Sequence, residues 1–475
     1  MSTPLHTADH DYASEPRWAG VREVMVMSWP IILGSMSYTF MDFVDKIFVS
    51  HVEDGTRAMA AAGAAGLVSY TLCTFALGII GCVGTFVAQS IGRGTPQLSA
   101  SYTWQGIYLS VFAGLLSLLL WPLTPLMFSW AGQTPDLIAL EVPYFQLRLP
   151  GYMAMAWMTA LAAFFQAAGA PRIPMYAAII TNLSDVFMNY ALIFGKFGFP
   201  EMGLNGAALS TTIAQWFQVA MLMTVFLGAR FNGEFRTRSS IALHMGRIRE
   251  LVRVGIPAGA SMFMDIFNWS IFTVLIVGSF GAVQLAAHNI AISFMHVAFM
   301  PALALNQGIA PIVGKWIGKK DFVRARKRSH TAIYIAVIYM SIMAGTFAVF
   351  GRPLIDWIFS DDPEVIALGQ KLLILAGIFQ GFDAIGIVTM GALRGAGDTR
   401  WMMWATMIIA YGIFIPMALF FAFTLNGQAF GGWVAAAIYI IIASGALLWR
   451  FNREKWRDIN IFDDEVQVPD PVSAK

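Results

Sequence analysis

Long apolar runs separated by short polar segments recur along the whole of this 475-residue chain. An apolar run of about 20 residues is long enough to cross a bilayer as a helix. The pattern predicts twelve membrane-spanning helices, at 22–50, 59–91, 102–126, 137–166, 173–196, 204–228, 251–279, 283–316, 329–351, 363–393, 402–425 and 429–450. We therefore expect an all-α, multi-pass membrane protein.

The composition agrees with this class. Hydrophobic residues make up 57% of the chain and charged residues only 12%, with a mean hydropathy of +0.65, whereas a soluble chain carries about 25% charged residues. The net charge of +2 gives no reason to expect a nucleic-acid partner. Cys73 and Cys82 lie in one apolar run, so we expect them to pack rather than to form a disulfide or bind a metal.

Lysine and arginine residues indicate the orientation of the chain. They gather in the connections after even-numbered predicted helices, above all at 229–250 and 317–328, and in the C-terminal tail. Connections after odd-numbered helices hold little beyond Arg57, Lys196 and Arg352. The positive-inside rule then places both termini in the cytoplasm. Because residues 1–21 lack the features of a cleaved signal peptide, we expect the first helix to insert the chain into the inner (plasma) membrane.

The two halves of the chain repeat each other. Four pairs of residues recur at displacements of 226 to 228: Pro30 and Pro257, Gly92 and Gly318, Gly169 and Gly397, and Gly203 and Gly431. We expect a cytoplasmic tail at 1–21, a six-helix lobe at 22–228, a cytoplasmic linker at 229–250, a second six-helix lobe at 251–450 and a tail at 451–475. Such parallel repeats are typical of alternating-access transporters, although a scaffold or a channel remains an alternative.

A small set of ionisable residues lies deep in the predicted helices, and most of them are acidic. The set is Asp42, Asp45, Lys46, Arg148, Asp185, Asp265 and Asp383. A charge at the bilayer centre costs about 2.5–3.5 kcal/mol on insertion scales, so such residues usually face an aqueous cavity and serve an ion or a substrate. A cavity lined by carboxylates attracts cations.

Polar residues in the first half allow two interpretations. Asp185 and Asn189 are four residues apart and share a helix face, and Thr211 lies in the next predicted helix. Oxygen ligands from two adjacent helices suit a Na⁺ or H⁺ site, but an interhelical hydrogen-bond clasp explains the same pattern equally well. Asp42 and Lys46 are also four apart, which favours a local ion pair near the outer mouth.

The carboxylates of the second half stand alone. Asp265 and Asp383 have no charged neighbour in sequence, and an isolated carboxylate in a low-dielectric site favours its protonated form, as a proton-coupled carrier requires. Aromatic rings near them suit an organic cation, and methionines form a deformable apolar wall. The candidate substrate cavity comprises Tyr38, Met262, Trp269 and Phe379.

At these residues the chain resembles the multidrug and toxic-compound extrusion (MATE) family, and within it the NorM-like bacterial branch. The resemblance covers the predicted helices throughout, and its most specific stretches are "FVDKIFVS", "QAAGAPRIPM", "NYALIFGKFGFPEMGLNGAALST", "GIPAGASMFMD" and "FQGFDAIGIVTMGALRGAGDT". It implies two lobes around a V-shaped central cavity and export of organic cations in exchange for inward Na⁺ or H⁺.

The resemblance also assigns site residues by position. It implies that the coupling ion, Na⁺ or H⁺, binds at Asp45, Asp185, Asn189 and Thr211, or at Asp265 and Asp383. The chain departs from the family pattern in three ways: Asp185 precedes Asn189 where the family commonly has Asn first, Asp265 stands where Glu is usual, and Lys46 follows Asp45.

These observations predict a monomeric antiporter that is not an enzyme. Its partners are small organic cations and the lipid bilayer, and it has no cofactor beyond the coupling ion. The alternatives are a lipid-linked oligosaccharide flippase of the same superfamily, whose cavity should be basic, and an intramembrane transferase. The scattered histidines offer no catalytic arrangement for the latter.

Overall fold

The computed structural model describes residues 17–52, 54–130, 133–359 and 362–463. These parts of the chain contain helices and no β-strand. The first half holds α1 (Arg17–Ser50), α2 (Gly55–Gly81), α3 (Val83–Gly92), α4 (Pro96–Leu118), α5 (Thr124–Trp130), α6 (Pro135–Ala167), α7 (Arg172–Ile193) and α8 (Gly203–Phe226). The short helix α9 (Ala229–Phe235) follows in the connection between the halves.

The second half begins with α10 (Met245–Ile271), which continues through the π-helix η1 (Phe272–Ile276) and the 3₁₀ turn η2 (Val277–Phe280). It goes on with α11 (Ala282–Gly318), α12 (Phe322–Ile358), α13 (Pro363–Ala396), α14 (Thr399–Ile409), η3 (Ala410–Phe414), α15 (Ile415–Leu419), η4 (Phe420–Thr424), α16 (Gln428–Asn452) and η5 (Lys455–Asp458).

Each predicted window overlaps a helix or a run of helices, although the window 102–126 runs past the end of α4, through a turn, into α5. In the described ranges, nine such runs are long and apolar enough to cross a membrane. The other three windows correspond to α4, α6 and α7, which have sufficient length but a more polar sequence. The prediction of an all-α, multi-pass membrane protein is confirmed.

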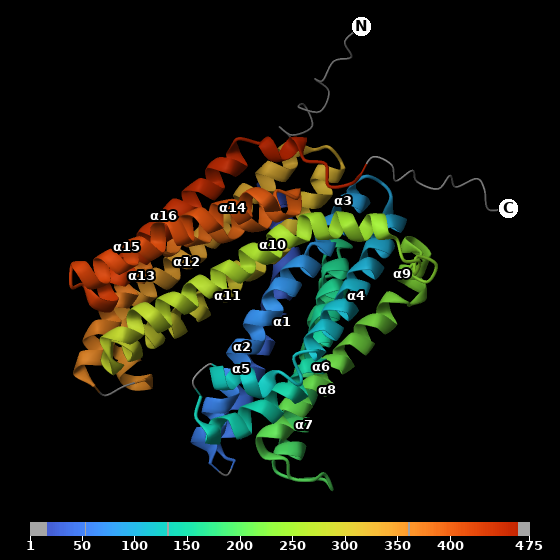
Figure 1. Cartoon of the computed structure of the whole chain (residues 1–475). Helices are drawn as coiled ribbons and strands as arrows, with labels where there is room; N and C mark the ends of the chain where they lie inside the picture. Colours follow the sequence, from blue (N-terminus) through green and yellow to red (C-terminus); the bar gives the residue numbers. More distant parts are fainter. Residues whose placement is uncertain (1–16, 53, 131–132, 360–361, 464–475) are drawn as a thin grey trace, which may run out of the picture.

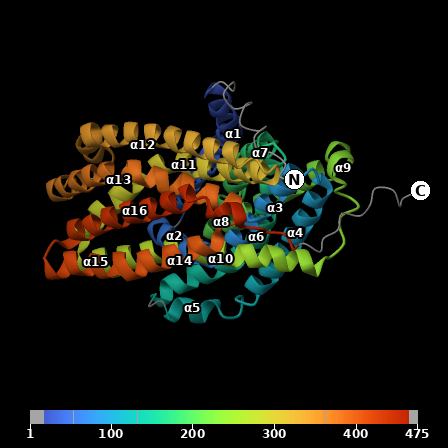
Figure 2. The same ribbon diagram turned by 90° about the horizontal axis from the view of Figure 1, so that it is seen from above.

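The helices form two bundles that make a V (Figure 1). One bundle contains α1 to α8 and the other contains α10 to α16, and they converge near the start of α1 and diverge away from it. The view along the perpendicular direction places the two bundles on opposite sides of the molecule (Figure 2).

Glycines allow the bundles to meet at the closed end of the V. A Cβ atom on Gly92 of α3 would lie 2.2 Å from the Lys315 carbonyl oxygen and 2.8 Å from the Gly318 Cα of α11. Any side chain at either glycine would push these backbones apart. Gly92 and Gly318 are counterparts in the sequence repeat, so the two copies of one motif touch each other across the interface.

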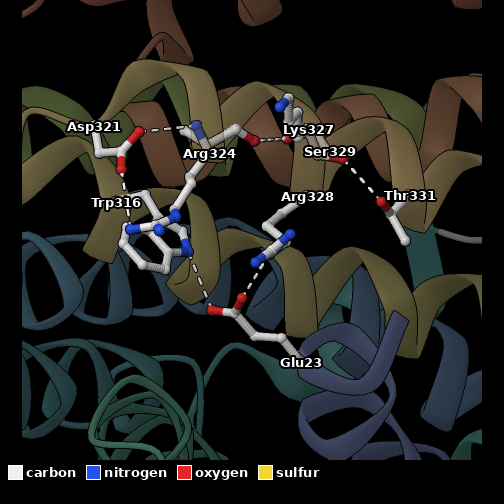
Figure 3. Close-up of polar contacts among 9 residues, drawn as sticks. Glu23, Trp316, Asp321, Arg324, Lys327, Arg328, Ser329 and Thr331 are labelled. Carbon is white, nitrogen blue, oxygen red and sulfur yellow. Dashed lines mark hydrogen bonds and ion pairs between the residues drawn. The ribbon is translucent and has the colours of Figure 1, made fainter. Parts of the chain in front are cut away.

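Ion pairs reinforce this end. Arg328 of α12 pairs with Glu23 of α1 at 2.6 Å, and the Trp316 indole of α11 donates a hydrogen bond of 3.1 Å to the same carboxylate (Figure 3). An Arg–carboxylate pair with a buried guanidinium and a second donor fixes the relative position of three helices. Glu23 therefore links the first bundle to the second.

The segment Ile459–Asp463 crosses from the second bundle to the first. Before it, Trp456 is fully buried and stacks on Phe451 of α16. After the crossing, the Phe462 ring packs edge-on against Phe86 of α3 and Tyr102 of α4, at centroid distances of 5.5 and 5.7 Å. This part of the predicted C-terminal tail is thus packed against both bundles.

Candidate functional site

A hydrogen-bonded polar site lies inside the first bundle. The Asn189 amide of α7 donates to Asp45 Oδ1 of α1 at 2.6 Å and to Asp185 Oδ2 at 3.2 Å. The Ser210 hydroxyl of α8 donates in turn to Asn189 Oδ1. Three helices therefore converge on one side-chain amide, which holds two carboxylates together.

The hydrogen bonds of this site are incomplete. Asp185 and Asn189 are both 0% exposed, and Asp185 Oδ1 has no hydrogen-bond partner in the described part of the chain. Buried polar atoms are almost always paired. The free oxygen, next to a second carboxylate, is suited to a proton or a hard cation.

Arg148 of α6 balances part of the negative charge. Its guanidinium lies 5.5 Å from the centre of the Tyr152 ring and within electrostatic range of Asp45 and Asp185. It forms no ion pair within 4.0 Å in the described ranges, and its Nη1 atom is buried without a hydrogen-bond partner. The two carboxylates are therefore attracted to a cation without being neutralised by direct contact.

Ser210, and not the predicted Thr211, contacts the polar site. The Thr211 hydroxyl donates to the Ala207 carbonyl of its own helix at 3.0 Å, whereas Ser210 reaches Asn189. Sequence reasoning missed Ser210, because two adjacent hydroxyl residues differ only in helix face, and the tertiary packing decides which face meets α7. The helix does supply a hydroxyl, as expected, but from the neighbouring position.

Asp265 of α10 and Asp383 of α13 lie within electrostatic range of each other in the second bundle. Neither carboxylate makes a hydrogen bond or an ion pair within the described residues. Tyr439 of α16 lies within electrostatic range of both. The structure thus brings the two predicted acids into one region but gives them no fixed partner.

Two buried amides near these acids in sequence were not predicted as site residues. Asn268 follows Asp265 by less than one helical turn, and Gln380 precedes Asp383 by the same interval. Both are 0% exposed, and neither amide group has a hydrogen-bond partner in the described ranges. The spacing of three residues was the available signal, since it places each amide beside its acid on a helix.

A cavity of about 310 Å³, here called the central cavity, is lined mostly by the first bundle and by a few residues of the second. Tyr38 of α1 and Met262 of α10 line it, and the Tyr38 hydroxyl donates to Gln218 Oε1 at 2.6 Å. Trp269 and Phe379 do not line it. Phe379 is 0% exposed in the core of the second bundle, and Trp269 packs against that core.

The charge pattern of this cavity differs from the sequence expectation. Its described lining contains none of the predicted acidic residues, and its one charged member is Arg394 of α13. The predicted acidic residues therefore do not form the walls of this cavity.

Asp42 and Lys46 form the predicted pair along α1. Their side chains are 2.7 Å apart and about two-thirds exposed. Asp45, between them in sequence, turns instead toward Asn189. The three charges of this helix therefore belong to two different environments.

Comparison with known proteins identifies the family of this chain. The model of the family described as MatE matches twice, at residues 30–191 and 257–420, with starting points separated by the repeat displacement. Among relatives, a probable multidrug resistance protein NorM of Thermotoga maritima is 27% identical over 92% of this chain and 93% of its own length. A protein of the same name from Pseudomonas aeruginosa is 29% identical over 91% of this chain and 88% of its own.

Solved structures agree on the fold. An outward-facing multidrug resistance MATE family transporter has a TM-score of 0.84 at 17% identity, covering 93% of this chain and 97% of its own. The bent form of the Vibrio cholerae MATE transporter VcmN has a TM-score of 0.81 at 19% identity, covering 94% and 99%. The expectation of a transporter rather than an enzyme is confirmed, and this chain belongs to the MatE family.

Proposed function

We propose that this protein is a secondary active antiporter that exports amphipathic organic compounds carrying a positive charge, in exchange for inward Na⁺ or H⁺. The names of its relatives as multidrug resistance proteins support efflux. The observation that carries the proposal is the site of Asp45, Asp185 and Asn189. It combines two carboxylates with a buried, unpartnered oxygen inside a membrane bundle.

Competition between the ion and the substrate couples the two movements. Binding of Na⁺ or H⁺ at Asp45 and Asp185, or at Asp265 and Asp383, removes negative charge from the region beside the cavity. A cationic substrate is then bound less strongly and leaves, and the lobes change their arrangement. Such a cycle requires only that ion and substrate favour different conformations.

The orientation follows from the positive-inside rule. In this proposal the protein is a monomer in the plasma membrane, with both termini in the cytoplasm. The open side of the V then faces outward. The packed end, with Glu23 and Arg328, then closes the cytoplasmic side.

Ethidium uptake into inverted membrane vesicles tests the proposal. Because inversion reverses the membrane, transport by an exporter accumulates the dye inside when a Na⁺ or pH gradient is imposed separately. We expect uptake under one of the two gradients, and loss of this uptake in Asp45→Asn and Asp383→Asn.

Asp42→Asn serves as the matched control, since it removes an exposed carboxylate from the same helix as Asp45. Absence of uptake under both gradients contradicts antiport. Full uptake in the Asp45 and Asp383 variants contradicts the choice of coupling residues while leaving antiport intact.

A further inference from the structure

Among the described residues that line the central cavity, Arg394 is the charged one, and its position is fixed by close helix packing. A Cβ atom on the neighbouring Gly395 would lie 2.2 Å from the Ala310 carbonyl oxygen of α11, so α13 and α11 touch through their backbones. The Thr85 hydroxyl of α3 donates to the Arg394 carbonyl at 3.0 Å. Arg394 therefore sits where the two bundles meet.

The guanidinium has no anionic partner. Its Nη2 atom donates to Asn306 Oδ1 at 2.8 Å, and this acceptor is neutral. Within the ranges that the structure describes, Arg394 forms no ion pair. A guanidinium has five N–H donors, and a cation removed from bulk water is unfavourable unless an anion accompanies it.

Two carboxamides share the cavity with Arg394. Gln166 of α6 and Gln307 of α11 both line it, one from each bundle. Neither side chain makes a hydrogen bond within the described part of the chain. The cavity therefore holds hydrogen-bond donors from both bundles, and a planar guanidinium matches a carboxylate in geometry.

The rest of the wall is largely apolar. It includes Ile31, Leu77, Met158, Met175 and Met262. A cavity of about 310 Å³ falls at the lower end of the range for drug-sized ligands, and methionine side chains adapt to ligands of different shape. The ligand that fits is a compact amphipathic molecule with an acidic group.

We propose that the central cavity binds the carboxylate of an amphipathic organic substrate at Arg394, with the apolar body of the substrate against the methionine wall. The inference rests on the proposed function, because it names the chemical class of the substrate. The proposed function names a substrate that carries a positive charge, and the inference adds a carboxylate to it. The substrate is then a zwitterion, whose carboxylate lies at Arg394 and whose cationic group lies away from it.

A pair of dyes that differ by one group tests the inference. A rhodamine with a free carboxylate is a zwitterion at neutral pH, and its methyl ester is a simple cation with the same ring system. Fluorescence anisotropy measures the binding of each dye to the purified full-length protein in nanodiscs. We expect the acid to bind about tenfold more tightly than the ester, as one charge-assisted interaction provides.

Variants of Arg394 and Gln307 test which side chains cause the preference for the acid over the ester. Arg394→Gln is expected to weaken binding of the acid by about tenfold and to change binding of the ester less than twofold, whereas Arg394→Lys keeps part of the preference. Gln307→Glu places a competing carboxylate in the cavity, so it should reverse the preference even if Arg394→Gln does not fold. Arg400→Gln, which removes an exposed arginine outside the cavity lining, is the matched control and should behave as the unaltered protein.

Equal affinity for acid and ester, or an equal loss of both in Arg394→Gln, overturns the inference. So does tight binding of a short-chain phosphatidic acid that Arg394→Gln abolishes while the affinity for both dyes stays unchanged, because this would identify Arg394 as a lipid-phosphate site. The binding assay needs no ion gradient, so it is independent of antiport. Acid-selective binding without gradient-driven uptake of ethidium or of either rhodamine would contradict the proposed function alone, and uptake without selectivity would contradict the inference alone.

Discussion

In the first bundle, Asn189 joins Asp45 and Asp185 in one hydrogen-bonded site. In the second bundle, Asp265 and Asp383 influence each other electrostatically but have no hydrogen bond in the described ranges. The first site is organised before an ion arrives, because its oxygens are already held in place. The second needs an ion, a proton or water to satisfy its acids.

The sequence repeat allows the acidic residues of one bundle to be compared with their counterparts in the other. At the repeat displacement of Pro30 and Pro257, the counterpart of Asp45 is Phe272, and the counterpart of Asp265 is Tyr38. Phe272 is 0% exposed in the core of its bundle, whereas Tyr38 lines the cavity. The two halves therefore share a backbone arrangement and differ in the polar groups that it carries, which allows each half a separate role.

The largest expected effect concerns transport. If both acidic regions couple ion to substrate, Asp45→Asn and Asp383→Asn should each reduce gradient-driven ethidium uptake by roughly 5–150-fold, the range of ordinary coupling energies. Uptake into inverted vesicles with matched expression measures this. A full loss in one variant and none in the other would assign coupling to a single bundle.

The next effect concerns stability and should separate the two regions. Asn189→Leu leaves the carboxylates of Asp45 and Asp185 and the Ser210 hydroxyl without their shared partner, so the free energy of unfolding should fall by about 1–3 kcal/mol. Asp383→Leu breaks no hydrogen bond and should not lower it. Thermal unfolding in detergent, followed by tryptophan fluorescence, compares the two. Equal destabilisation would mean that Asp383 has partners in solution comparable to those of Asp185.

Sodium should distinguish an organised site from an unorganised one. At ten times its dissociation constant, Na⁺ should stabilise the protein by about 1.4 kcal/mol, because the oxygens around Asp185 are already placed. We expect the resulting shift in the unfolding midpoint to vanish in Asp185→Asn and to persist in Asp265→Asn, with K⁺ at equal ionic strength as the reference. The opposite pattern would place the Na⁺ site in the second bundle.

The smallest effect is expected at the exposed charges of α1. Lys46 and Asp42 are about two-thirds exposed and 2.7 Å apart, and such pairs contribute about 0–1 kcal/mol. Lys46→Ala should therefore leave the unfolding midpoint and the dye uptake nearly unchanged. A large change in the ion dependence of uptake would show that Lys46 acts on Asp45, its neighbour in sequence.

Much of the fold was predictable, because apolar segments long enough to cross a bilayer have few other stable structures. The candidate site was predictable in kind but not in detail. Asp185 and Asn189 share a face by helical spacing alone, yet Asp45 is 144 residues away from Asn189, and only the packing of α1 against α7 brings them together. The same reason explains why Phe379 was misjudged as a cavity residue when α13 buries it in the core.

Hydropathy and spacing are properties of the chain, and they were enough to predict the multi-pass helical class, the duplication and the few residues whose charge needs an explanation. The partners of those charges depend on the packing of helices that are far apart in sequence. Which hydroxyl of α8 reaches Asn189, and which single charge lines the central cavity, depend on how bundles meet through close backbone contacts such as Gly92 with Gly318 and Gly395 with Ala310.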